Sequence, residues 1–253
     1  MKANFSIRKE VKVTAVIVGL SFLIAFTERK QGGEMCRDVV VQIENIHENH
    51  FLDEADIMQL VEGSGQPIKG IGISRIKLKE IERKLKFDKH ILDAELFGDL
   101  KGNLIVKVEL RRPIARIVQN DAPDAYIAED GVIMPVSEKY TSRVLLISGA
   151  VKHLLESEDL NTTEEGKQLL QMIEYINADR FWKAQVAQLD IEKNGKINMY
   201  PQVTGQLVEF GKPENWEVKF NKLMIFYKEI LPTRGWARYE RVNLEYEGQV
   251  IAE

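Results

Sequence analysis

Alternating and helical patterns of apolar residues fill the stretch from residue 38 to residue 112. Residues 39–46 (VVVQIENI) alternate as a β-strand does. Two helical patterns follow, one over residues 53–63 with Asp53 as its predicted cap and one over residues 74–85 with Ser74 as its cap. HILDAELFGD and GNLIVKVELRR then predict two strands joined by a short turn. The order β-α-α-β-β predicts a complete small α/β module.

The stretch from residue 113 to residue 253 consists of shorter segments separated by turn residues. Apolar runs in IARIV, AYIAEDGVIMPV and RVLLISG predict strands, with a tight turn at Glu129-Asp130-Gly131. Asn194-Gly195 predicts a hairpin between VAQLDIEK and KINMYPQV, and QLVEFGK predicts one more strand. Residues 237–253 alternate as a strand to the last position. These segments predict a mixed β-domain.

Two longer helical patterns lie in this second stretch. The first covers residues 160–177, with Asn161 or Thr162 as its cap, and the second runs from Pro213 to Leu231. We therefore expect two helices in the β-domain. The expected fold class is α+β, in which a β-α-α-β-β module precedes a mixed β-domain with two helices.

Pro113 separates the two stretches. It follows a predicted strand in ELRRPIAR, where it cannot donate a ladder hydrogen bond and favours an extended conformation for Arg112. We place the domain boundary here, so that one domain covers residues 38–112 and the other residues 113–253.

Residues 13–27 (VTAVIVGLSFLIAFT) form an uncharged apolar run after the basic tail at 1–12. A helix of this length spans about 22 Å, which flanking lysines and arginines extend toward the roughly 30 Å of a bilayer core. An uncleaved transmembrane anchor is favoured over a buried helix and over a cleaved signal peptide, because TERKQGGEM offers no small-residue cleavage site. The basic tail predicts a cytoplasmic N-terminus, with the linker at 28–37 and both domains across the membrane.

Composition narrows the functional classes. The 253-residue chain is 44% hydrophobic and 29% charged, typical of a folded protein, and its net charge of −4 argues against nucleic-acid binding. Cys36 is the single cysteine, so no intramolecular disulfide forms.

No motif in the sequence indicates a catalytic, metal or cofactor site. His47 and His50 are three residues apart rather than the four of a helical zinc motif. Gly70-Ile71-Gly72 lacks the third glycine of a dinucleotide fingerprint, and Ser148 lacks the glycine of a nucleophile elbow. We therefore expect a non-enzymatic protein without cofactor, metal or small-molecule substrate. An unrecognised membrane-bound hydrolase stays an alternative, and the residues to test for it are Asp190, Glu192, His153 and Glu209.

Several motifs, in this order, resemble the FtsQ/DivIB family of bacterial cell-division proteins. IERKLKFDKHILDAELFG is similar to part of the family's POTRA domain, and VELRRPIARI to its Glu-Arg-x-Pro-x-Ala junction. YIAEDGVIMPV, LLISGA and VNLEYEGQVIA resemble later strands of its β-domain. Residues 29–61 are similar to members from the Bacteroidetes. Asn243 and Glu245 depart from the family's Asp-Leu-Arg-Tyr ending.

The resemblance implies a scaffold of the division machinery in the inner membrane, single-pass, with a periplasmic POTRA-like domain and β-domain, located at mid-cell during septation. Its implied partners are coiled-coil proteins of the FtsB/FtsL type. They would add a strand to the last strand of the chain, since edge strands expose backbone hydrogen-bonding groups. The residues that match this partner-binding surface are Tyr239, Val242, Leu244, Tyr246, Gly248 and Val250. A POTRA-bearing accessory of outer-membrane protein assembly or secretion is the alternative.

Overall fold

The structure is a computed structural model that describes residues 14, 16–20, 35–47, 49–63, 65 and 67–253. The chain divides into two compact units. The first contains the described residues up to Glu44 together with those of Asp53–Glu109, and the second contains those of Asn45–Leu52 together with Leu110–Glu253. The short segment Asn45–Leu52 therefore belongs with the second unit although the chain returns to the first unit after it.

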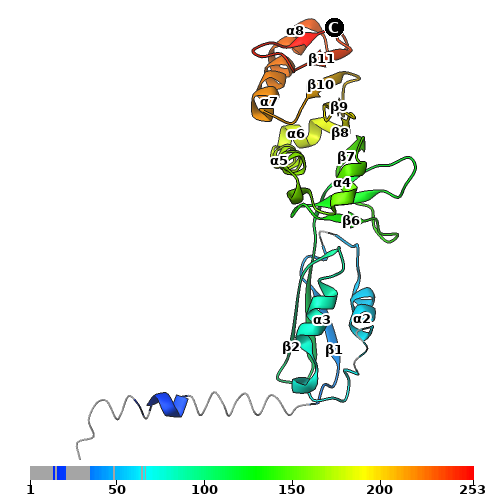
Figure 1. The fold of residues 1–253 in the computed structure, drawn as a ribbon. Helices are drawn as coiled ribbons and strands as arrows, with labels where there is room; N and C mark the ends of the chain where they lie inside the picture. The colour runs from blue at the N-terminus through cyan, green and yellow to red at the C-terminus, as the bar shows by residue number, and fades with distance from the viewer. Residues whose placement is uncertain (1–13, 15, 21–34, 48, 64, 66) are drawn as a thin grey trace, which may run out of the picture. The chain divides into compact units, whose positions relative to one another are not determined.

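The first unit has the predicted order of elements (Figure 1). The elements are β1 (Val39–Ile43), α2 (Glu54–Glu62), a 3-10 turn (Ile73–Arg75), α3 (Leu78–Leu85), β2 (Ile91–Gly98) and β3 (Leu104–Leu110). The three strands form a sheet in the order β1-β3-β2, with β1 parallel to β3. The prediction of a β-α-α-β-β module is confirmed.

The two helices of this unit begin in different ways. Asp53 caps α2 as predicted, and it forms a capping box with Asp56. The predicted start of the second helix at Ser74 is wrong, because Ser74 lies in the 3-10 turn and Ile76 is extended and buried. An extended Ile76 cannot continue a helix, so α3 begins only at Leu78.

The second unit contains a nine-stranded sheet in the order β12-β11-β10-β9-β8-β7-β4-β5-β6. The strands are β4 (Pro113–Ile117), β5 (Ala125–Ala128), β6 (Ile133–Pro135), β7 (Leu145–Gly149), β8 (Val186–Ile191), β9 (Ile197–Pro201), β10 (Leu207–Gly211), β11 (Arg241–Asn243) and β12 (Ile251–Ala252). Strands β4, β7 and β8 run parallel to one another, and the pairs β4–β5, β5–β6, β8–β9 and β9–β10 are antiparallel. The predicted turns have Gly131 at φ +87° and Gly195 at φ +79°, which glycine adopts readily.

The second unit has more helices than the two that the pattern predicts. They are α4 (Lys152–Ser157), a 3-10 turn (Leu160–Thr162), α5 (Glu164–Ala178), α6 (Arg180–Gln185), α7 (Trp216–Ile225), a π-helical turn (Phe226–Ile230) and α8 (Leu231–Arg234). Helices α4 and α6 have six residues each, less than two turns, which is too short to show a helical period. Thr163 caps α5, in place of Asn161 or Thr162, because Asp159 already caps the 3-10 turn before it. The prediction that Pro213 opens the later helix is also wrong, since Asn215 has a left-handed conformation and α7 starts after it.

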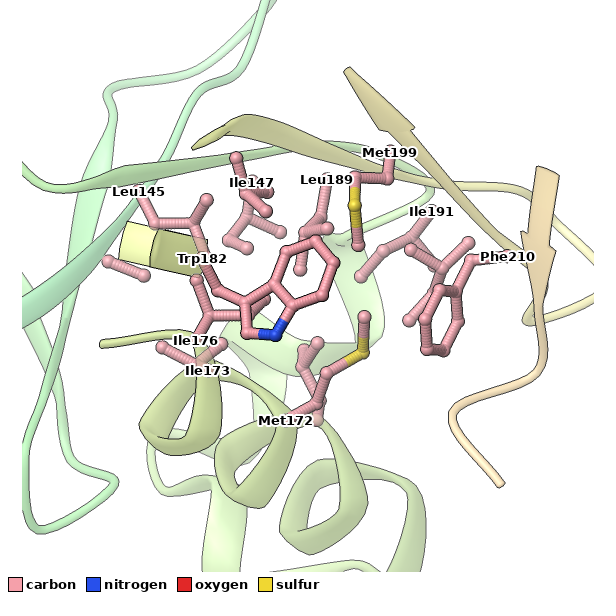
Figure 2. Close-up of a cluster of buried hydrophobic side chains, with 14 of the residues drawn as sticks. Leu145, Ile147, Met172, Ile173, Ile176, Trp182, Leu189, Ile191, Met199 and Phe210 are labelled. Carbon is pink, nitrogen blue, oxygen red and sulfur yellow. The ribbon is translucent and has the colours of Figure 1, made fainter. Parts of the chain in front are cut away.

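The helices and the sheet share one large core. Figure 2 shows the indole of Trp182 among Met172 and Ile176 of α5 and strand residues such as Ile147 and Leu189. Trp182 is 1% exposed, and its ring lies 4.8 Å from that of Phe220 in α7. Burying each such large apolar side chain contributes about 1.5–3 kcal/mol, so this core holds the helices against the sheet.

Strand β5 is buried on both of its faces. Ile127 belongs to the large core, whereas Tyr126 packs against Phe51 from the segment Asn45–Leu52, with the two rings 5.1 Å apart. Tyr140 packs against Phe51 at 5.2 Å. This second, smaller core explains why the segment Asn45–Leu52 belongs to the second unit.

The predicted anchor at residues 13–27 lies largely outside the described residues. Thr14 and residues 16–20 are helical. Within the part of the chain that is described, no helix has the length and apolar character needed to span a bilayer.

Candidate functional site

The C-terminal residues form a small hairpin at one edge of the large sheet. Strand β11 runs parallel to β10 with Val208 opposite Val242, and β12 pairs antiparallel with β11. The expectation of one continuous strand over residues 237–253 is wrong. A turn at Glu247 and Gly248, where Gly248 has φ +64°, splits it into two short strands. Alternating polarity extends through both strands and the connection, so the sequence pattern hides this turn.

The six predicted partner-binding residues take different positions in this hairpin. Val242 and Leu244 are fully buried in the large core. Tyr239 packs against Phe226 with the rings 5.7 Å apart. The other three residues lie in or after the connection: Tyr246 is 55% exposed, Gly248 is in the turn, and Val250 is half-buried just before β12. Of the six, Tyr246 is therefore the large side chain that is most exposed to solvent.

The backbone of β12 presents hydrogen-bonding groups on the side that faces away from β11. Arg241 and Glu253 exchange backbone hydrogen bonds, at 3.2 Å from the Arg241 N–H and 3.0 Å from the Glu253 N–H. In an antiparallel pair, the residues that alternate with such a pair direct their N–H and C=O away from the neighbouring strand. The N–H and C=O of Ala252, which lies opposite Val242, therefore point outward. This geometry suits the addition of another strand.

Lys222 of α7 holds the connection between β11 and β12 in place. Its Nζ donates to the carbonyl oxygens of Leu244 and Tyr246, each at 2.7 Å, and to that of Gln249 at 3.2 Å. Burial lowers the pKa of Lys222. One lysine side chain therefore links three backbone carbonyl groups of the connection to helix α7. No local sequence signal marks this lysine, because its role depends on where α7 packs.

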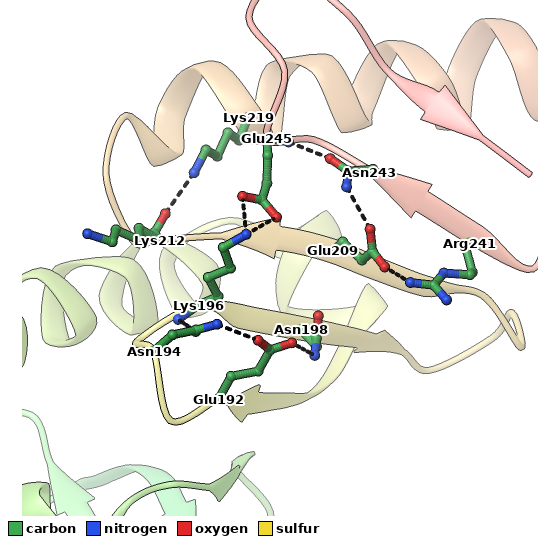
Figure 3. A network of polar contacts seen from close by, with 10 residues as sticks. All are labelled: Glu192, Asn194, Lys196, Asn198, Glu209, Lys212, Lys219, Arg241, Asn243 and Glu245. Atoms are coloured by element: carbon green, nitrogen blue, oxygen red, sulfur yellow. Dashed lines mark hydrogen bonds and ion pairs between the residues drawn. The ribbon is translucent and has the colours of Figure 1, made fainter.

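A polar network on the outer surface fixes β11 to its neighbours (Figure 3). Glu209 accepts hydrogen bonds from Arg241 and, at 2.6 Å, from Asn243. Lys196 forms an ion pair with Glu245 at 2.8 Å, and the hydrogen bond between them raises the pKa of Lys196. The two residues that depart from the family pattern, Asn243 and Glu245, are thus held by contacts within the unit.

A row of polar side chains crosses five strands on this outer face. The register aligns Ser148, Asp190, Asn198, Glu209 and Asn243. Asp190 accepts a hydrogen bond from Ser148 at 2.5 Å. Glu192, just beyond β8, accepts from Asn194 at 3.0 Å and Asn198 at 2.9 Å, and these bonds lower the pKa of Glu192. Hydrogen bonds to neighbouring side chains account for Asp190 and Glu192 as parts of the sheet surface.

The residues suggested for a hydrolase do not form one site. His153 of α4 lines a separate cavity of about 110 Å³, whose wall includes the buried residues Ile191 and Ile197 of the helix-covered face. Asp190 and Glu209 lie on the other face of the sheet. Among the described residues, no group of three or more His, Cys, Asp or Glu side chains could hold a metal ion. The arrangement at the C-terminal edge is suited to binding a polypeptide backbone.

Comparison with protein families shows to which family this chain belongs. The family described as FtsQ/DivIB, C-terminal related, matches residues 112–253, more than half of the 253 residues. The chain belongs to the FtsQ/DivIB family. The POTRA-like domain matches residues 34–109, so the predicted resemblance is confirmed in both parts. No curated protein matches the chain.

Membership in the FtsQ/DivIB family indicates the general role of the chain. The two matched domains indicate a role in cell division, within a non-enzymatic family whose members interact with other division proteins. The family implies a membrane protein of the division site.

Proposed function

We propose that this protein is a non-enzymatic scaffold of the division machinery. In this proposal the apolar segment at 13–27 anchors it in the inner membrane with its N-terminus cytoplasmic, and residues 38–112 and 113–253 form its two periplasmic domains. The second domain links coiled-coil partners of the FtsB/FtsL type by adding a partner strand to the sheet.

The outward-directed backbone of β12 carries the proposal. Ala252 offers one N–H and one C=O in the geometry of a strand edge. Tyr246 and Val250, in the connection that leads to β12, supply apolar surface, since both are at least partly exposed. Tyr239, Val242, Leu244 and Gly248 contribute by shaping the hairpin that holds β12. Backbone pairing supplies most of the affinity in strand addition, while side-chain contacts supply specificity.

Substituting Ala252 by proline tests this assignment of the edge. Proline removes the outward N–H, and because that group is not used within the sheet, the domain keeps its fold. We expect the full-length Ala252→Pro protein to retain about tenfold less coiled-coil partner in a co-purification, the loss of about one good backbone hydrogen bond. Ala252→Gly, which keeps the N–H, serves as the matched control and retains partner normally. A folded Ala252→Pro protein that retains partner at the wild-type level would refute strand addition at β12.

Substituting Leu244 by proline is a weaker test than the sequence implies. Its N–H donates to the Glu209 carbonyl at 3.0 Å and thereby joins β11 to β10. A proline there breaks the sheet itself, so loss of partner would report unfolding.

Localisation during the cell cycle tests the wider role. A fluorescent fusion of the full chain is expected to form a ring at mid-cell during septation. A uniform envelope signal at that stage would contradict a function in division, whatever the outcome of the co-purification.

A further inference from the structure

A cavity of about 490 Å³ opens at the end of the large sheet where β4, β7 and β8 begin. All of its lining residues belong to the second unit, and none comes from β11 or β12. Its volume is within the range of about 300–1,000 Å³ that is typical of ligand sites. The cavity is therefore large enough for a short peptide segment.

The rim of this cavity is positively charged although the chain as a whole carries a net charge of −4. Three cationic side chains, Arg112, Arg143 and Lys183, line it together with one acid, Glu129. Arg112 lies 3.9 Å from Glu129. Arg143 and Lys183 are exposed, and neither side chain has an ion-pair partner among the described residues. Two cations thus remain available to a ligand.

Part of the cavity lining is apolar. It includes Ile114, Leu145, Ile176 and Val186, and the last three are at most 6% exposed. The nearby Asn177 side chain already donates to the Ile114 carbonyl at 3.1 Å. The C-terminal end of α5 also lies here, and the carbonyl groups at such an end disfavour a negative charge. An anion is therefore expected at the rim with the cations, and an apolar group against the wall.

Exposed cationic residues and buried apolar residues line the same cavity, and an extended peptide can contact both kinds. In an extended peptide, successive side chains point to opposite sides, so an acidic residue beside an apolar one can reach the rim and the wall at once. We propose that this cavity binds an extended acidic–apolar segment of a partner polypeptide, at a position other than the C-terminal edge. The carboxylate contacts Arg143 and Lys183, and the apolar side chain packs against Leu145 and Val186.

Peptide binding to the full-length protein in detergent tests this proposal. The probes are the acetylated and amidated peptide Leu-Glu-Leu-Glu, its analogue Leu-Gln-Leu-Gln, and free glutamate, measured by calorimetry at low and high salt. We expect the acidic peptide to bind about tenfold more tightly than the amide analogue, since each exposed ion pair contributes up to about 1 kcal/mol. Its affinity should fall as salt screens the charges.

Substitutions distinguish peptide binding in the cavity from non-specific attraction between opposite charges. The double variant Arg143→Gln, Lys183→Gln should lose about tenfold in affinity for the acidic peptide. Lys193→Gln, an exposed lysine outside the cavity lining, is the matched control and should bind as the wild type does. Equal binding of the two peptides, equal binding of free glutamate, unchanged binding by the double variant, or no binding of the acidic peptide would each overturn the proposal. Because no residue of β11 or β12 is altered, these outcomes are independent of the Ala252→Pro experiment.

Discussion

Strands β6 and β12 form the two edges of the same sheet, and the chain treats them differently. Residues 158–160 of the same chain cover the outer side of the sheet where β6 begins. The Ile133 N–H donates to the Glu158 carbonyl at 2.9 Å, and the Leu160 N–H donates to the Gly131 carbonyl at 3.0 Å. In the described part of the chain, no further strand pairs with the outer side of β12, toward which Ala252 directs its backbone groups. We refer to these as the closed edge and the open edge.

The two edges differ in whether the outward backbone groups are covered by other parts of the chain. An unpaired strand edge invites unwanted pairing, and proteins limit this risk by covering the edge or keeping it short and charged. The closed edge is covered by residues 158–160. At the open edge, β12 has two residues, and the charged Glu253 that follows it lies opposite Arg241 of β11. In the function that we propose, the uncovered edge is the one to which a partner strand is added.

Proline at each edge gives the largest expected contrast. Ile133→Pro removes the hydrogen bond to Glu158 and a buried side chain, and should lower the free energy of unfolding by about 4 kcal/mol. Ala252→Pro removes an outward donor and should lower it by less than about 1 kcal/mol. Denaturation by urea, followed by tryptophan fluorescence, measures both, because all three tryptophans lie in the second unit.

Ile133→Ala is the control for the closed edge, since it removes the side chain and keeps the N–H. Its loss should be about 2–3 kcal/mol, smaller than that of the proline variant. Equal losses from the two proline substitutions would show that the edges do not differ in the way described.

Two glycines with positive φ allow a finer comparison of the edges. A Cβ on Gly131, at the closed edge, would lie 2.4 Å from Asn161 Nδ2, which donates to the Asp130 carbonyl at 2.8 Å. A Cβ on Gly248, beside the open edge, would meet nothing within 4 Å. Gly131→Ala should therefore cost about 2–3 kcal/mol, from backbone strain and a lost hydrogen bond, and Gly248→Ala about 1 kcal/mol from strain alone. Urea denaturation that ranks the two in the opposite order would contradict this packing.

The contrast between the edges also marks what the sequence could predict. The helix cap at Asp53 and the turns at Gly131 and Gly195 are local, and the pattern located each of them. The closed edge could not be found in this way, because it joins Ile133 to Glu158 across a six-residue helix too short to show a period. Short elements and long-range contacts are the features that residue periodicity does not record.

At the candidate site, too, the sequence predicted some features and not those that depend on long-range contacts. Its place near the C-terminus followed from the family resemblance. That resemblance assigned Val242 and Leu244 to the partner-binding surface, whereas both side chains are buried in the large core. The turn at Gly248 and the outward direction of Ala252 depend on the register between β11 and β12. A register is set by tertiary pairing, so the sequence pattern did not single out Ala252.

Lys222 tests whether the open edge is held from the helix layer. Lys222→Met keeps much of the aliphatic side chain and removes the three hydrogen bonds to the connection. We expect stability to fall by about 1–2 kcal/mol, and faster hydrogen exchange at the amides of residues 244–252. Lys228→Met, in the π-helical turn, is the control and should leave exchange in this hairpin unchanged. Unchanged exchange in Lys222→Met itself would mean that the connection is held by other contacts.

The smallest expected effect is a pH dependence of opposite sign for two lysines beside the open edge. The pKa of Lys196 is raised by its hydrogen bond with Glu245, so its stabilising contribution is present at neutral pH and is lost as pH rises above the ordinary lysine value of about 10.4. The pKa of Lys222 is lowered by burial, so the folded state releases that proton first. The contribution of Lys222 to the free energy of unfolding therefore grows as pH rises toward the ordinary lysine pKa.

Urea denaturation in steps through the alkaline range separates the two lysines. The stability of the wild type relative to Lys196→Met should decline above the ordinary lysine pKa, whereas its stability relative to Lys222→Met should increase below it. Lys193→Met, an exposed lysine in the β8–β9 turn, is the control and should show no such trend. Parallel trends for Lys196 and Lys222 would mean that the two side chains have similar surroundings, and that α7 does not shield the connection at the open edge from water.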